Sequence, residues 1–130
     1  MKKVIPILLL LSIALTACAA PAQDLNAYRQ VSVQEAINLM ATENDYIILD
    51  VRTAQEYVSG HIPGALLLPN ESIGTEAPLE LPDKEQLILV YCRSGNRSKQ
   101  ASAKLAQLGY TNIVEFGGIN SWPGEIVTGW

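Results

Sequence analysis

The chain has 130 residues, which allows one domain and a targeting segment but excludes a two-domain protein. Its 48% hydrophobic content is typical of a globular protein and excludes bulk disorder. The net charge of -4 argues against a broad nucleic-acid interface, so no nucleic-acid partner is expected. Two cysteines, Cys18 and Cys92, occur in very different settings.

The N-terminal residues have the pattern of an export signal. Lys2 and Lys3 precede an apolar run over residues 4–15. That run is too short to span a bilayer, which takes roughly 20 residues. A positive start followed by a short apolar run is typical of a secretory signal peptide. We therefore expect the protein to be exported.

The end of this run resembles the lipobox of bacterial lipoproteins. The residues are Leu15-Thr16-Ala17-Cys18, and in that family the chain is cut before the cysteine, whose thiol is acylated. The resemblance implies a signal peptide over residues 1–17, lipidation at Cys18 and a tether over residues 18–30. The expected location is the periplasmic or extracytoplasmic face of a bacterial membrane, because several acyl chains anchor a protein stably. Ordinary secretory cleavage at a small residue is the alternative.

Two helix starts can be recognised by capping boxes. Ser32 is followed three residues later by Glu35, and Thr53 is followed by Glu56. In each pair the hydroxyl and the carboxylate satisfy backbone N–H groups at the helix start. A third helix is expected from about Arg97 to Leu108, with Gly109 as its stop.

Short apolar runs between these helices predict buried strands. The runs cover residues 46–49, 65–68, 87–91 and 113–116, and residues 69–86 are interpreted as a long surface connection containing a helical turn. Strands that alternate with helices indicate an α/β domain over residues 31–130, with a mostly parallel sheet buried on both faces. Reactive groups gather at the carboxyl ends of strands in such sheets, where both Asp50 and Cys92 stand.

Cys92 is the candidate nucleophile. It follows the apolar run 87–91 and precedes a polar loop and a helix. Backbone N–H groups of such a loop, the N-terminus of the helix and the positive charges of Arg93 and Arg97 would all lower the pKa of the thiol. A buried structural cysteine is the alternative, but the flanking residues are too polar for a core. The candidate substrate-binding residues follow directly: Arg93, Ser94, Gly95, Asn96, Arg97 and Ser98.

From residue 31 to the C-terminus the chain resembles a single-domain rhodanese. The matching segments are Asp50-Val51-Arg52 with Glu56, residues 60–65, residues 90–98, residues 108–110, and residues 117–119 with Trp122. Their order and spacing carry the resemblance. It implies a three-layer α/β fold with a mostly parallel five-stranded sheet and helices on both faces.

The rhodanese resemblance also implies a reaction. Cys92 would take a sulfane sulfur from thiosulfate or a related anionic donor, hold it as a persulfide, and pass it to a thiol or to cyanide. Arg93 and Arg97 would orient the donor, while Asp50 and Arg52 would be structural and Glu56 a helix cap that pairs with Arg52. No cofactor and no metal are expected, since one histidine and one free cysteine cannot complete a tetrahedral site.

Three alternatives stay open from the residues alone. A phosphatase or arsenate reductase of the related cysteine-loop type has five residues between Cys and Arg, whereas four separate Cys92 from Arg97 here. The shorter loop suits a single sulfur atom better than a phosphate. A tethered, non-catalytic binding or sensing module would keep the same fold. A Cys92–His61 dyad is the least favoured, because the turn that holds His61 lies away from the sulfur-bearing cysteine in this family.

Overall fold

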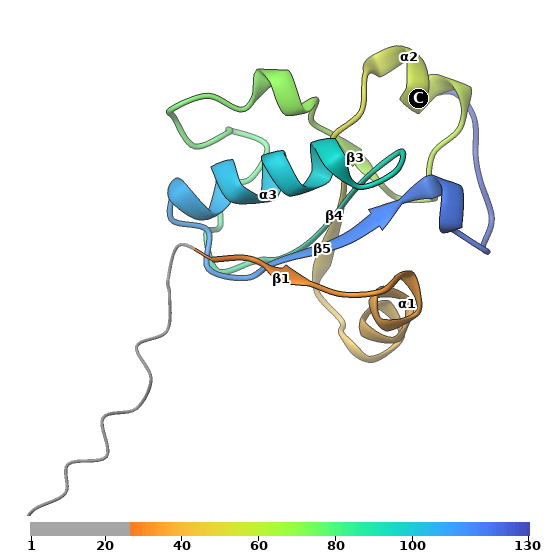
Figure 1. Cartoon of the computed structure of the whole chain (residues 1–130), viewed down its shortest axis with the longest axis horizontal. Coiled ribbons are helices and arrows are strands. Elements are labelled where there is room, and N and C mark those ends of the chain that lie inside the picture. Colours follow the sequence, from red (N-terminus) through yellow and green to blue (C-terminus); the bar gives the residue numbers. More distant parts are fainter. Residues whose placement is uncertain (1–26) are drawn as a thin grey trace, which may run out of the picture.

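The computed structural model describes residues 27–130, and these form one five-stranded parallel sheet in the order β1-β5-β4-β2-β3 (Figure 1). The strands are β1 (Arg29–Gln30), β2 (Tyr46–Asp50), β3 (Leu66–Leu67), β4 (Leu87–Cys92) and β5 (Ile113–Gly118). The helices are α1 (Val33–Thr42), α2 (Ala54–Ser59) and α3 (Asn96–Gln107), with 3₁₀ turns η1 (Asn70–Ser72) and η2 (Ile119–Ser121). The export segment and Cys18 lie outside the described residues.

The sheet separates two hydrophobic cores, so the domain has three layers. α3 covers one face of the sheet and α1 covers the other (Figure 1). Ala101 and Leu105 of α3 pack in the first core, and Ala36 of α1 and Tyr57 of α2 pack in the second. Since β4 is buried on both faces, its apolar run does not alternate with polar residues. The predicted α/β fold class is confirmed.

Both predicted capping boxes are present. The Ser32 hydroxyl accepts a hydrogen bond from the backbone N–H of Glu35, whose carboxylate accepts from the N–H of Ser32. Thr53 and Glu56 make the equivalent pair at the start of α2. The third helix begins and ends one residue earlier than predicted.

The sheet begins earlier in the chain than the sequence pattern indicated. Arg29 and Gln30, assigned to the tether, form β1 and pair with Val114 and Glu115 of β5. A two-residue edge strand has no apolar run by which it could be recognised. Among residues 27–130, no helix combines the length and the hydropathy needed to cross a membrane.

The connection over residues 69–86 is more than a surface loop. It contains the expected helical turn, η1, but it also buries Ile73 and Leu81 in the core beneath α3. The backbone carbonyl of Leu81 accepts a 2.6 Å hydrogen bond from the hydroxyl of Tyr110. The proline and acidic residues of this segment are typical of a surface loop, so its two buried apolar residues could not be recognised from the sequence.

Candidate active site

Cys92 is the last residue of β4, and the loop that follows folds back over its sulfur. The backbone N–H of Gly95 donates a 3.0 Å hydrogen bond to Sγ of Cys92. Gly95 has φ of +113°, a conformation that favours glycine, and this lets the chain reverse and begin α3 at once. The predicted arrangement of strand, loop and helix is therefore present, with the N-terminus of α3 next to the thiol.

The surroundings of Cys92 shift its ionisation. The side chain is 1% exposed, and burial by itself would raise the pKa of the thiol. A hydrogen bond with the side chain of Ser98, and hydrogen bonds from the backbone of Ser98, Gly95 and Ser94, outweigh that effect, so the pKa of the thiol lies below its ordinary value. The thiolate, the reactive form of cysteine, is favoured accordingly.

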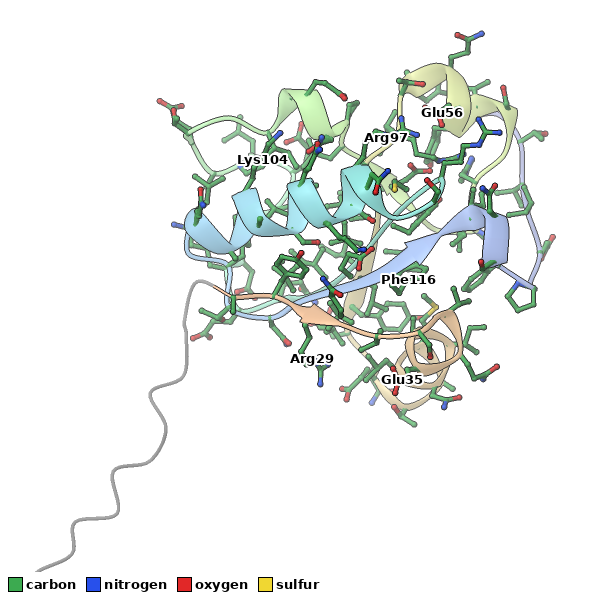
Figure 2. The ribbon with its side chains drawn as sticks, viewed as in Figure 1. Arg29, Glu35, Glu56, Arg97, Lys104 and Phe116 are labelled. Carbon is green, nitrogen blue, oxygen red and sulfur yellow. The ribbon has the colours of Figure 1, made fainter. Side chains whose placement is uncertain are left out.

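Arg97 is held by an ion pair that the sequence did not predict. Its guanidinium contacts both carboxylate oxygens of Glu56, at 2.6 Å and 3.0 Å. Figure 2 shows the two side chains meeting between α3 and α2. The hydrogen bond from Arg97 is the main reason that the pKa of Glu56 falls to about 2. The expectation that Glu56 pairs with Arg52 is wrong. Glu56 binds Arg97 at the start of α3, and Arg52 binds Asp50 instead.

Arg52 pairs with Asp50 in the scaffold behind the loop. Its guanidinium donates to both oxygens of Asp50, the shortest contact being 2.7 Å, and to the backbone carbonyl of Gly60 at 2.7 Å. The hydroxyl of Tyr91, the residue before Cys92, also donates to Asp50 at 2.7 Å. Because each buried polar group here has a partner, this network holds the ends of β2 and β4 together.

His61 is engaged away from Cys92. Its Nδ1 lies 2.8 Å from the backbone carbonyl of Tyr57, and the two rings stack with their centroids 3.7 Å apart. The backbone of His61 also pairs with Val127 near the C-terminus. These contacts occupy the imidazole in packing rather than in a Cys–His pair.

A cavity of about 390 Å³ opens beside the loop. Arg93, Arg52, Gln55 and Asn120 are among the residues that line it. Arg93 is exposed, as are Ser94 and Asn96, whereas Gly95 and Ser98 are buried. The predicted binding residues therefore divide into a solvent-facing group that can meet a ligand and a buried group that contacts the sulfur.

Sequence reasoning missed Glu115, a carboxylate next to this buried group. Its side chain is 2% exposed, and Oε1 accepts a 2.6 Å hydrogen bond from the hydroxyl of Ser98. The same oxygen accepts from the backbone N–H of Gly117 at 2.8 Å. The one indication in the sequence was a single acidic residue in an apolar run, separated by one residue from Gly117 and Gly118.

Comparison with known proteins places the chain in a family. Residues 32–125 match the model of the rhodanese-like domain. The chain therefore belongs to the rhodanese-like family. It is 42% identical over 84 residues to a sulfurtransferase of Allochromatium vinosum, which covers 64% of this chain and 77% of that protein. It is 33% identical over 113 residues to the thiosulfate sulfurtransferase GlpE of Pseudomonas entomophila, covering 81% and 97% respectively.

Solved structures agree with this assignment. A rhodanese from E. coli determined with anions has a TM-score of 0.59 at 31% identity, covering 65% of this chain and 99% of that one. A rhodanese-like domain protein of Staphylococcus aureus has a TM-score of 0.67 at 27% identity, covering 77% and 97%. The family match and the sulfurtransferases among its relatives show that the chain is a sulfurtransferase of the rhodanese type.

Proposed function

We propose that Cys92 carries the transferred sulfur as a persulfide, with thiosulfate or a related sulfane-sulfur anion as donor. The observation that carries the proposal is the position of Sγ, which accepts the N–H of Gly95 beside the N-terminus of α3. The thiolate attacks the outer sulfur of thiosulfate, a new S–S bond forms at Cys92, and the S–S bond of the donor breaks. Sulfite leaves with the electron pair of that bond.

The second half of the cycle requires an acceptor from outside the domain. Cys92 is the one cysteine among residues 27–130, and it is unpaired. No neighbouring thiol of the described domain can therefore resolve the persulfide. A free thiol or cyanide would attack its outer sulfur and release Cys92 as a thiolate, in a ping-pong cycle.

The two loop arginines have different roles in this proposal. Arg93 is exposed at the cavity and can meet an incoming anion directly. The charge of Arg97 is shared with Glu56, so it contributes less to attraction of the donor. Its bidentate pair instead joins α2 to the start of α3 and keeps the loop in place.

Sulfur transfer is tested by incubating the protein with thiosulfate and measuring its intact mass. We expect a gain of one sulfur atom, lost again when a small thiol or cyanide is added. Protein alkylated at Cys92 beforehand should gain no sulfur. Unchanged mass across thiosulfate and other sulfane-sulfur donors would favour a binding module. Phosphate-ester hydrolysis that depends on Cys92 would favour a cysteine-loop phosphatase.

We further propose that Cys18 is lipidated and anchors the protein to the periplasmic or extracytoplasmic face of a bacterial membrane. The support is the export segment and the lipobox-like residues 15–18. Cys18→Ser should move the protein from the membrane fraction to the soluble fraction, because the acylated thiol is lost. Cys92→Ser is the matched control and should stay with the membrane. Membrane association that survives Cys18→Ser would mean an uncleaved segment or another anchor.

A further inference from the structure

A chain of three side chains links the sulfur of Cys92 to a buried carboxylate. Sγ of Cys92 lies 3.4 Å from Oγ of Ser98, which lies 2.6 Å from Oε1 of Glu115. The three groups come from β4, α3 and β5, and all are buried, with exposed fractions of 1%, 0% and 2%. The nucleophile is thus joined through one hydroxyl to a group that can accept a proton.

The hydroxyl of Ser98 has one proton to donate and several oxygens around it. The backbone carbonyls of Gly95 and Gly117 lie at 2.9 Å and 3.3 Å, and Oε1 of Glu115 is the nearest acceptor. A separation of 2.6 Å is typical of a hydroxyl that donates to a charged carboxylate. With its proton directed at Glu115, Oγ offers a lone pair to the S–H of Cys92.

Packing alone does not account for a carboxylate at position 115. Side chains alternate along a strand, so Glu115 shares the face of Ile113, which packs in the core beneath α3. Within residues 27–130, Glu115 takes part in no ion pair. A buried charge without a cationic partner is costly, whereas a neutral amide could accept the same two hydrogen bonds.

The charged groups around this chain of side chains leave its carboxylate uncompensated. Arg97 on α3 faces the thiol but is held by Glu56 of α2, and Glu71 of η1 acts on the same guanidinium. β4 presents Val90 opposite Glu115. From the other neighbouring strand, β1, Arg29 points to the side of α1 (Figure 2).

We propose that Glu115 is the proton acceptor for Cys92, with the hydroxyl of Ser98 as the relay between them. The S–H bond of Cys92 breaks and its proton binds Oγ of Ser98, while the original hydroxyl proton moves to Oε1 of Glu115. A thiol and a carboxylate become a thiolate and a carboxylic acid, so the charge moves to the sulfur without a proton leaving the protein. The hydroxyl of Ser98 and the N–H of Gly95 then both donate to the thiolate.

This inference deepens the proposed function, because it rests on Cys92 being the sulfur-bearing nucleophile. Ser98 touches the reacting sulfur, and Glu115 is a positioning residue that acts through it. When an acceptor takes the sulfur from the persulfide, Cys92 departs as a thiolate. The proton stored on Glu115 returns to it by the same path.

The test is the pH dependence of Cys92 alkylation by iodoacetamide, which reports the thiolate whether or not any sulfur is transferred. In the wild type we expect the alkylation rate to stop falling and reach a plateau as the pH is lowered, because the thiol proton has then moved to Glu115 and the thiolate persists. Glu115→Gln should lose that plateau, so that the rate falls about tenfold per pH unit with the thiolate fraction. An unchanged plateau, or faster alkylation in Glu115→Gln, would overturn the proposal.

The serine variants separate a relay from a direct electrostatic effect. Ser98→Ala leaves Glu115 in place but removes the hydroxyl, and it should lose the plateau as Glu115→Gln does. The double variant should be no slower than either single one, because both changes break the same path. Additive losses would contradict the relay. Ser102→Ala is the matched control, and its profile should match the wild type. Ser102 is a fully buried serine of α3 whose hydroxyl has no hydrogen-bond partner within residues 27–130.

A measurement on the wild-type protein does not depend on any variant folding. Two groups that exchange a proton titrate as a pair, so each responds at both steps. The ¹³C resonances of Cys92 Cβ and Glu115 Cδ should therefore change together as the proton is exchanged. Resonances that change independently of each other would refute the relay.

Discussion

We expect Cys92→Ser to abolish sulfur transfer from thiosulfate while leaving the domain folded. The hydroxyl replaces the thiol at nearly constant shape in a site that is 1% exposed, so the packing beneath α3 is kept. Serine cannot form a persulfide and does not ionise near neutral pH, so loss of the nucleophile should lower kcat/KM by a factor on the order of 10³ or more. Steady-state turnover with thiosulfate and cyanide measures the loss.

Two controls make the Cys92→Ser result specific. The circular dichroism spectrum and thermal unfolding midpoint of the variant should match those of the wild type, which excludes misfolding. Wild-type protein alkylated at Cys92 should lose turnover to the same extent. Turnover in Cys92→Ser within tenfold of the wild type would show that the sulfur does not pass through this residue.

Gly118→Ala should displace the active-site loop. Gly118 ends β5 opposite Cys92, and a Cβ atom there would overlap the backbone carbonyl of Arg93 and lie 2.6 Å from the backbone nitrogen of Ser94. Backbone atoms cannot move aside as a flexible side chain can. We expect a loss of about 1–3 kcal/mol in the free energy of unfolding. Misplacement of the loop should lower sulfur transfer by about 10²-fold.

Gly74→Ala is the matched control for Gly118→Ala. In the part of the chain that the structure describes, a Cβ at Gly74 would meet no atom within 4 Å, so both stability and turnover should stay near the wild-type values. Urea unfolding and steady-state turnover measure both variants. Wild-type turnover in Gly118→Ala would mean that the loop tolerates a shift of its first residues.

The sequence predicted those helices and strands that are specified by residues close together in the chain. A capping box needs two residues three positions apart, so Ser32 with Glu35 and Thr53 with Glu56 could be recognised directly. The apolar run 87–91 predicted β4 because a central parallel strand is buried on both faces. β1 was not predicted, because a strand of two residues at a sheet edge has no composition of its own to mark it. It is a strand only because it pairs with Val114 and Glu115 of β5.

The order of a buried strand, Cys92, a short polar loop and a helix can be recognised in the sequence. This order is enough to predict the nucleophile and the backbone groups around it, because those residues are neighbours in the chain. The charged groups that act on the site could not be predicted in this way, because they come from distant parts of the chain. Arg97 lies 41 positions from Glu56, and Ser98 lies 17 positions from Glu115, so both pairs exist only after α2, α3 and β5 meet.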